Sequence, residues 1–304
     1  MVYLVTGGAG FIGSHIVDRL SADGHHVRIL DDFSTGKREN TAASPDAEII
    51  TGDVGDFDTV RAAMEGVNAV FHQAAIASVP ATVANPLASE RTNYRGTLNV
   101  LEAARHAGTQ RVIFACTAAV YGDLPGLPKR EDMPLRSLSP YAVDKLASEC
   151  ACQMYHHLYG LETVALRYFN VFGPRQDPAS PYSGVISIFS DSLRQGKHPV
   201  IYGDGEQTRD FVYVSDVVEA NIRALNSATA PGKAINIATG GTLSINNLLQ
   251  TICQLQDHAF SPVYKTAREG DIRHSHADIQ LAREHLDWQP AVGLEAGLRM
   301  LFSG

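Results

Sequence analysis

The sequence is poor in cysteine and has no long apolar run. Its cysteines are too few and too irregularly spaced for a disulfide framework, and they are Cys116, Cys150, Cys152 and Cys253. The pair Cys150 and Cys152 has no second Cys or His pair at zinc spacing, so we expect reduced thiols and no metal site. No segment approaches the roughly 20 apolar residues of a membrane span. Strand-like residues 2–5 stand where a signal segment would lie, so we expect a cytoplasmic protein without a membrane partner.

Basic residues are also in the minority. There are 25 Lys and Arg against 33 Asp and Glu, a formal net charge of −8, which repels polyanions and makes a nucleic-acid partner unexpected. The composition is otherwise that of a globular chain, with 44% hydrophobic residues, which excludes disorder. A length of 304 residues leaves room for about two packed lobes.

Short apolar runs alternate with longer amphipathic ones through the first half of the chain. Strands are expected at 2–5, 27–30, 69–72, 111–116 and 163–167, and helices at 14–23, 57–65, 90–107 and 141–159. This rhythm predicts an α/β fold with a doubly wound parallel sheet of the Rossmann type. After about residue 168, Gly- and Pro-rich connections break the rhythm and predict a smaller, interleaved α/β substrate lobe. We assign 1–168 to the nucleotide domain, with 212–240 returning to it, and 169–211 and 241–304 to the second lobe.

A glycine-rich turn follows the first strand. Gly7, Gly10 and Gly13 allow a tight turn, a close approach of backbone N–H groups to a pyrophosphate, and close packing of the next helix. Phe11 and Ile12 lie in the same turn. About 20 residues on, the second strand ends in Asp31 and Asp32, where a carboxylate can bind ribose hydroxyls and repel a 2′-phosphate.

These residues therefore predict NAD as the cofactor, against the alternative of a surface turn with a helix-capping acid. The expected cofactor contacts further along the chain are small or acidic residues at strand ends. They are Asp53 and Val54, beside the adenine, and Ala74 and Ala75, against which the cofactor can lie.

The glycine turn, Tyr141-x-x-x-Lys145 and Asn170-Val-Phe-Gly occur together in one chain. In this combination the sequence resembles the extended short-chain dehydrogenase/reductase family of nucleotide-sugar enzymes over essentially its whole length. The resemblance places the hydroxyl of Thr117 beside Tyr141 and implies a proton-handling triad of Thr117, Tyr141 and Lys145. Tyr141 and Lys145 lie four residues apart on one helix face, where the ammonium is expected to lower the pKa of the phenol and make it a usable base.

The residues after Thr117 bear on the reaction type. Dehydratases and decarboxylases of the family carry an additional acid and base here, whereas this chain has Ala118 and Ala119. The resemblance then implies a UDP-sugar 4-epimerase that oxidises one sugar carbon and returns the hydride from the other face.

The second lobe carries the residues that the resemblance implies for UDP-sugar binding. Asn170 contacts the sugar or diphosphate, Arg209 and Arg268 the phosphates, and Asp271 the nucleoside ribose. Ser275 matches a position where Tyr restricts the site to UDP-glucose and UDP-galactose and a small residue admits an acetamido group. The expected substrates are therefore UDP-GlcNAc and UDP-GalNAc, with some activity on the plain sugars.

Several alternatives stay open. The chain could be a UDP-glucose 4-epimerase restricted to non-acetylated sugars, a UDP-glucuronate epimerase, an oxidoreductase that releases NADH, or a non-catalytic NAD-binding regulator. The resemblance also implies a homodimer built on the helices at 90–107 and 141–159, which carry apolar residues on more than one face.

Overall fold

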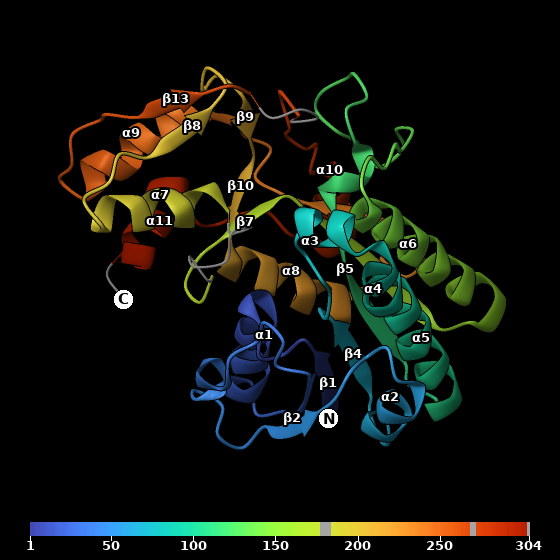
Figure 1. The fold of residues 1–304 in the computed structure, drawn as a ribbon. Helices are drawn as coiled ribbons and strands as arrows, with labels where there is room; N and C mark the ends of the chain where they lie inside the picture. Colours follow the sequence, from blue (N-terminus) through green and yellow to red (C-terminus); the bar gives the residue numbers. More distant parts are fainter. Residues whose placement is uncertain (177–183, 268–271, 303–304) are drawn as a thin grey trace.

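A computed structural model describes residues 1–176, 184–267 and 272–302 (Figure 1). Its centre is a seven-stranded sheet with the strand order β11-β6-β5-β4-β1-β2-β3, in which every neighbouring pair is parallel. The strands are β1 (Val2–Thr6), β2 (His26–Asp31), β3 (Glu48–Thr51), β4 (Ala69–His72), β5 (Arg111–Thr117), β6 (Glu162–Tyr168) and β11 (Ala234–Ile237). The predicted doubly wound α/β fold is confirmed.

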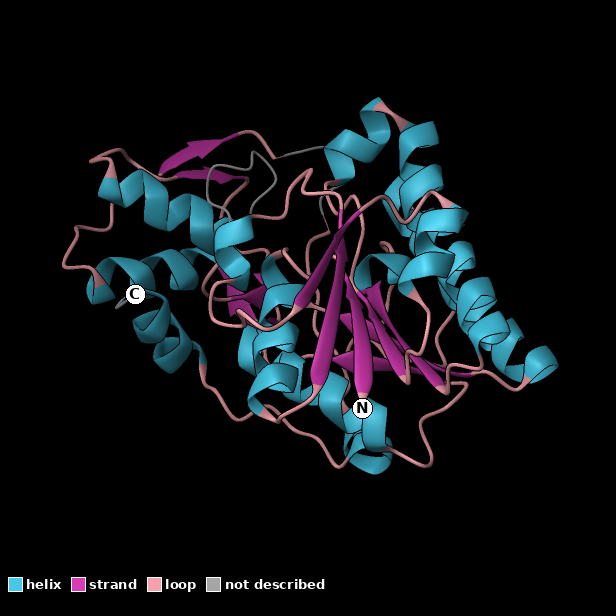
Figure 2. Cartoon of the chain, turned by 90° about the horizontal axis from the view of Figure 1, so that it is seen from below, coloured by secondary structure: helices cyan, strands magenta, loops and turns pink. Residues whose placement is uncertain are grey.

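Helices cover both faces of this sheet (Figure 2). One face packs against α1 (Phe11–Ala22) and α8 (Val214–Asn226), the other against α2 (Phe57–Ala63), α5 (Gly96–Ala107) and α6 (Pro140–Tyr159). In β1, Tyr3 and Val5 enter the first core and Leu4 the second. Since both faces are covered, the strand is apolar throughout rather than alternating, and each fully buried large side chain contributes roughly 1.5–3 kcal/mol.

Local signals fix the ends of the helix that carries Tyr141 and Lys145. Ser139 caps α6 by accepting a hydrogen bond from the Ala142 N–H at 3.2 Å, Pro140 occupies the first turn, and Gly160 ends the helix with φ +70°. These signals place both side chains in the first two turns of α6, beside the carboxyl end of β5.

Two expected helices differ from the structure. Helix α1 begins at Phe11 rather than at residue 14, because Gly10 is its N-cap and the end of the glycine turn already has helical geometry. The segment expected at 90–107 divides into a π-helical stretch, η2 (Glu90–Arg95), and α5. Before η2 lie the short helices α3 (Val79–Ala84) and α4 (Pro86–Ser89).

A second layer lies beyond the carboxyl edge of the sheet, around a third core that includes Phe172, Phe189 and Leu248 (Figure 1). Its strand pairs are short: β7 (Asn170–Phe172) with β10 (Phe211–Tyr213), β8 (Val200–Tyr202) with β13 (Val263–Lys265), and β9 (Thr208–Arg209) with β12 (Leu243–Ser244). Its helices are α7 (Val185–Arg194), α9 (Ile245–Leu255) and α11 (Leu294–Phe302).

The remaining elements are α10 (Gln280–Leu286), which contacts α8 and β11, and the single turns η1 (Arg38–Thr41) and η3 (Ala118–Tyr121). Within the described ranges, no helix is both long and apolar enough to span a bilayer.

Candidate active site

The glycine turn forms a cradle at the start of α1. Gly7 has φ +67°, and a Cβ there would lie 2.7 Å from the backbone nitrogen of Ala74. A Cβ on Gly13 would collide with the carbonyl oxygen of Gly7. Only glycine therefore lets this turn sit against the end of β4, and the N-terminus of α1 opens beside it. Such a backbone suits an anion.

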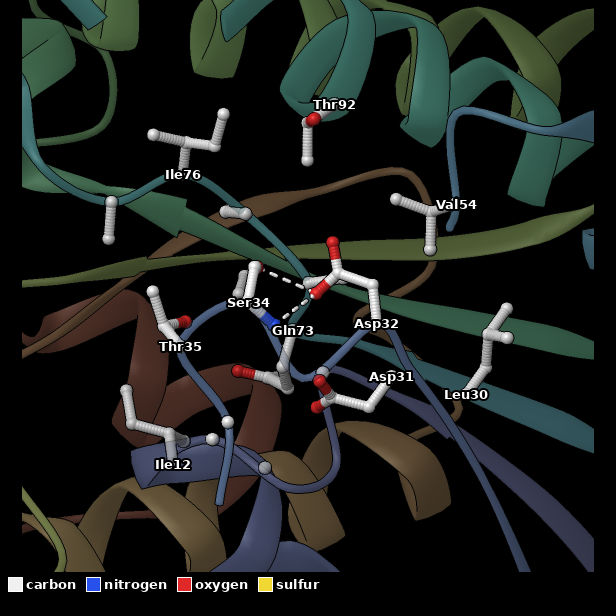
Figure 3. A pocket seen from close by; sticks show the side chains of 18 of the residues that line it. Ile12, Leu30, Asp31, Asp32, Ser34, Thr35, Val54, Gln73, Ile76 and Thr92 are labelled. Atoms are coloured by element: carbon white, nitrogen blue, oxygen red, sulfur yellow. Dashed lines mark hydrogen bonds between the residues drawn. The ribbon is translucent and has the colours of Figure 1, made fainter. Parts of the chain in front are cut away.

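Two carboxylates stand at the end of β2, next to the cradle. Asp31 accepts hydrogen bonds from the backbone N–H groups of Ala9 and Phe33, both at 2.9 Å, which ties β2 to the glycine turn. Burial raises the pKa of the Asp31 carboxyl, and these two hydrogen bonds oppose the rise. Asp32 accepts from the backbone and hydroxyl of Ser34 (Figure 3).

The cradle and the carboxylates open into one cleft of about 550 Å³. Every residue predicted to bind the cofactor lines it: Gly7, Gly10, Phe11, Ile12, Gly13, Asp31, Asp32, Asp53, Val54, Ala74, Ala75, Tyr141 and Lys145. Sequence reasoning missed further lining residues, among them Arg91 and Tyr168. Figure 3 shows five others: Ser34, Thr35, Gln73, Ile76 and Thr92.

The missed residues differ in whether the sequence carried a signal for them. Gln73 directly follows the buried strand β4, and Tyr168 is the last residue of the buried strand β6. Ligands of such sheets bind at the carboxyl ends of the strands, so the sequence carried a signal for both residues. Arg91 comes from η2, where no local motif marks it, and pairs at 2.6 Å with Asp53, which also lines the cleft.

Thr117, Tyr141 and Lys145 come together at the carboxyl end of β5. The phenol of Tyr141 lies near the hydroxyl of Thr117, close enough for that hydroxyl to lower the pKa of the phenol. Lys145 is 2% exposed, and its amino group donates to the carbonyl oxygen of Ala115 at 2.8 Å. Of the predicted triad, Tyr141 and Lys145 line the cleft, and Thr117 follows the lining residue Cys116 at the end of β5.

The expected lowering of the tyrosine pKa is wrong for the protein chain by itself. Burial raises the pKa of Tyr141 to about 12, although the nearby Thr117 hydroxyl opposes the rise. The lysine charge is itself weakened, because burial lowers the pKa of Lys145 to about 8. The Lys145 amino group is engaged by a carbonyl oxygen rather than by the phenol, so desolvation has the larger effect on Tyr141.

A buried ion pair lies directly behind the triad, and sequence reasoning missed it. Glu149 and Arg167 are each 3% exposed at the side chain and make two contacts, at 2.6 and 2.9 Å. The thiol of Cys116, next to Thr117 in β5, donates to Glu149 at 3.2 Å. Burial, followed by the charge of Glu149, raises the pKa of this thiol and keeps it protonated. Glu149 lies four residues after Lys145 on α6, but no spacing within the helix marks its partner on β6.

The residues assigned to the sugar nucleotide lie in the second layer. Asn170 is exposed in β7, and Arg209 is in β9 at the edge of a second cavity of about 320 Å³. Ser275 is held to β9, since its backbone N–H donates to the carbonyl oxygen of Thr208 at 3.1 Å. Arg268 and Asp271 lie outside the described residues. Among the described residues, no three His, Cys, Asp or Glu side chains are grouped to hold a metal ion.

Residues 3–238 match the model of the NAD dependent epimerase/dehydratase family. The chain belongs to this family. The UDP-glucose 4-epimerase of Mycolicibacterium smegmatis is 42% identical over 300 residues, covering 97% of this chain and 95% of the relative. NAD is the cofactor of the family, and the glycine cradle, open beside a helix N-terminus, fits its pyrophosphate.

Two solved structures are similar along nearly their whole length. A UDP-glucose 4-epimerase from Thermotoga maritima, with UDP-glucose, has a TM-score of 0.96 and 38% identity, covering 100% of this chain and 98% of that one. A UDP-N-acetylglucosamine 4-epimerase from Methanobrevibacter ruminantium M1, in complex with UDP-N-acetylmuramic acid, has a TM-score of 0.94 and 41% identity, covering 99% and 96%. One of these two similar proteins is therefore solved with a plain sugar nucleotide and the other with an acetylated one.

Proposed function

We propose that the protein is a UDP-sugar 4-epimerase that uses NAD and acts on UDP-GlcNAc and UDP-GalNAc, with some activity on UDP-glucose and UDP-galactose. The observation that carries this proposal is that Tyr141, whose phenol is close enough to the Thr117 hydroxyl for that hydroxyl to lower its pKa, lines the same cleft as the glycine cradle. A proton-accepting group and a dinucleotide-binding turn on one cleft are what reversible oxidation of a sugar hydroxyl requires.

NAD, when bound, would supply reversible hydride chemistry at the sugar C4, so the net reaction would be redox-neutral. The protein handles the proton. Tyr141 takes it from the 4-hydroxyl as the C4–H bond breaks and gives it back once the ketone has turned its other face. Thr117 holds the reacting oxygen through its hydroxyl, and Lys145 lies one helical turn after Tyr141, with its amino group on the carbonyl oxygen of Ala115.

The environment of Thr117 supports epimerisation over elimination or decarboxylation. Ala118 and Ala119 form the start of η3 directly after Thr117 and carry no titratable group. Loss of water or of a carboxyl group needs a further acid or base near the sugar. Reorientation of a ketone between two hydride transfers needs none.

The cofactor would lie along the cleft, with its pyrophosphate at the cradle and its adenosine ribose at Asp31. The sugar nucleotide would then extend from Thr117 toward Asn170, Arg209, Arg268, Asp271 and Ser275. A guanidinium suits the diphosphate because its forked donors match paired phosphate oxygens. The small side chain of Ser275 supports the acetylated sugars, which need space at the 2-position.

Proton NMR of the purified protein with UDP-GlcNAc, and separately with UDP-glucose, tests the proposal through the anomeric signals of the 4-epimers. Faster conversion of UDP-GlcNAc is the expected result. Conversion of UDP-glucose alone would retain the mechanism and reject the acetylated preference. Conversion of neither, with NAD bound, would favour a regulator or a different sugar nucleotide.

We also propose a homodimer. Apolar side chains are exposed on α6, at Val143 and Leu158, and on the adjoining α3 and α4, at Val83 and Leu87, with exposed fractions between 53% and 80%. Exposed large apolar side chains on helices that pack together are typical of an interface between copies of one chain.

A further inference from the structure

Asp210 is a buried acid between β9 and β10 with an unusual set of partners. Its side chain is 1% exposed and accepts four hydrogen bonds. Three come from the 239–240 turn: the Thr239 N–H at 2.8 Å, the Thr239 hydroxyl at 2.6 Å and the Gly240 N–H at 2.9 Å. The fourth comes from the N–H of Ala277 at 3.3 Å. One carboxylate therefore joins three segments that are distant in the sequence.

These segments adjoin every described residue that we assign to the sugar nucleotide in the second layer. Arg209 precedes Asp210 in the chain, and Ala277 is two residues after Ser275. The main-chain carbonyl of Asp210 accepts a hydrogen bond from the N–H of Asn170 at 3.0 Å. We infer that Asp210 is a positioning residue of the substrate pocket, which fixes these three substrate contacts relative to one another without touching the substrate.

The chemistry of a carboxylate explains why aspartate is needed here. An ionised carboxylate only accepts hydrogen bonds, and all four groups that face it are donors. An asparagine of the same shape would turn an NH2 group toward two of these donors. The backbone of either the 239–240 turn or the 277 segment would then lose its acceptor and shift. The side chain would keep its volume, so the effect would come from the hydrogen bonds and not from a cavity.

The test is Asp210→Asn, with Asp216→Asn as the matched control. Asp216 is also buried, at 4% exposed, and also accepts a backbone hydrogen bond, from the Val292 N–H at 3.0 Å. The segment that it holds carries none of the proposed substrate contacts. UDP binding by the NAD-loaded protein is measured by calorimetry, together with NAD affinity, thermal unfolding, and KM and kcat for UDP-GlcNAc and UDP-glucose.

For Asp210→Asn we expect the Kd of UDP and the KM of both sugars to rise about tenfold or more, with kcat and NAD affinity within about threefold of wild type. A rise in the Kd of UDP and in KM without a change in kcat or NAD affinity distinguishes a shifted substrate pocket from general destabilisation. The control should leave UDP affinity within about threefold. A second, milder variant, Thr239→Val, removes only the hydroxyl donor and should weaken UDP binding about two- to fivefold even if Asp210→Asn does not fold.

The inference rests on the proposed function, and the outcomes separate the two. If wild-type protein binds NAD but not UDP, both are overturned. If wild type binds UDP, and Asp210→Asn binds it within twofold of wild type or is weakened no more than Asp216→Asn, only the positioning role is overturned. If Asp210→Asn does not fold, the Thr239→Val variant decides. The positioning role is overturned if this variant binds UDP as tightly as wild type does.

Discussion

The hydroxyl of Tyr141 is the group that the proposed mechanism requires to take a proton, and the Thr117 hydroxyl near it lowers its pKa. Tyr141→Phe removes this oxygen and keeps the ring that lines the cleft. We expect turnover to fall by about 10² or more, with NAD affinity within about twofold of wild type. Initial rates by NMR and a NAD titration measure the two effects. A variant that kept more than about a tenth of the wild-type rate would contradict a base at Tyr141.

Ser275 is expected to set the space at the sugar 2-position. Ser275→Tyr should suppress turnover of UDP-GlcNAc by about 10² and leave UDP-glucose within a few-fold, since steric exclusion discriminates against the larger substrate only. The matched control is Ser275→Ala, which keeps the space and should keep the preference. Competition assays with both sugars measure the ratio. A preference unchanged in the tyrosine variant would show that the 2-substituent lies elsewhere.

At the scale of elements, the ion pair between α6 and β6 holds the helix that carries Tyr141 and Lys145. Glu149→Gln leaves the Arg167 guanidinium buried without its counter-charge, which costs about 3–5 kcal/mol of unfolding free energy. Urea denaturation measures this loss. Glu295→Gln breaks the exposed pair with Arg299 in α11 and should change stability by no more than about 0.5 kcal/mol. Equal effects of the two substitutions would refute the structural role of the buried pair.

The same two elements show what the sequence predicts and where local signals end. Helix α6 was predictable because Ser139 and Pro140 mark its start and Gly160 its end, and strand β6 because it is a buried apolar run. The pairing of Glu149 with Arg167 joins residues 18 apart on different elements, and only the packing of helix on sheet brings them together. The two- and three-residue strands of the second layer are likewise defined by their partners.

The cofactor cleft was predictable because its residues follow consecutive strand ends, whereas Arg91 enters it from a helix that carries no such signal.

At the scale of the whole molecule, the proposed homodimer makes a prediction about assembly. Leu158→Glu or Leu87→Glu places a charge at an apolar site that is 61% or 80% exposed in the single chain. Either should convert the dimer to a monomer in light-scattering chromatography, because a buried unpaired charge opposes association. Phe260→Glu, at an exposed site beyond α9, is the control and should leave the dimer intact. A wild-type protein that is monomeric at micromolar concentration would contradict the dimer.

The pH dependence of folding stability follows from a histidine in the centre of the sheet. His72, at the end of β4, is 1% exposed and lies between the hydroxyls of Thr6 and Thr97, at 2.6 and 3.0 Å. Because the Thr97 hydroxyl donates to a backbone carbonyl, it accepts from the imidazole Nε2–H, so the ring is neutral with Nδ1 as acceptor. Burial, and then the charge of Lys145, lowers the pKa of His72 to about 3.

Between pH 6.5 and 3 the unfolded chain therefore binds a proton at this residue that the folded chain does not, and stability falls as the pH falls. The loss from His72 amounts to about 2 kcal/mol between pH 7.5 and 5. Urea unfolding measures the loss of unfolding free energy between pH 7.5 and 5, and this loss should be smaller by about 2 kcal/mol in His72→Gln than in wild type. The variant starts from a lower stability at pH 7.5. His258→Gln, at an exposed site, should keep the wild-type dependence. If His72→Gln lost as much stability on acidification as wild type, the imidazole would have to accept its proton in the folded state, and the neutral bridge between Thr6 and Thr97 would be wrong.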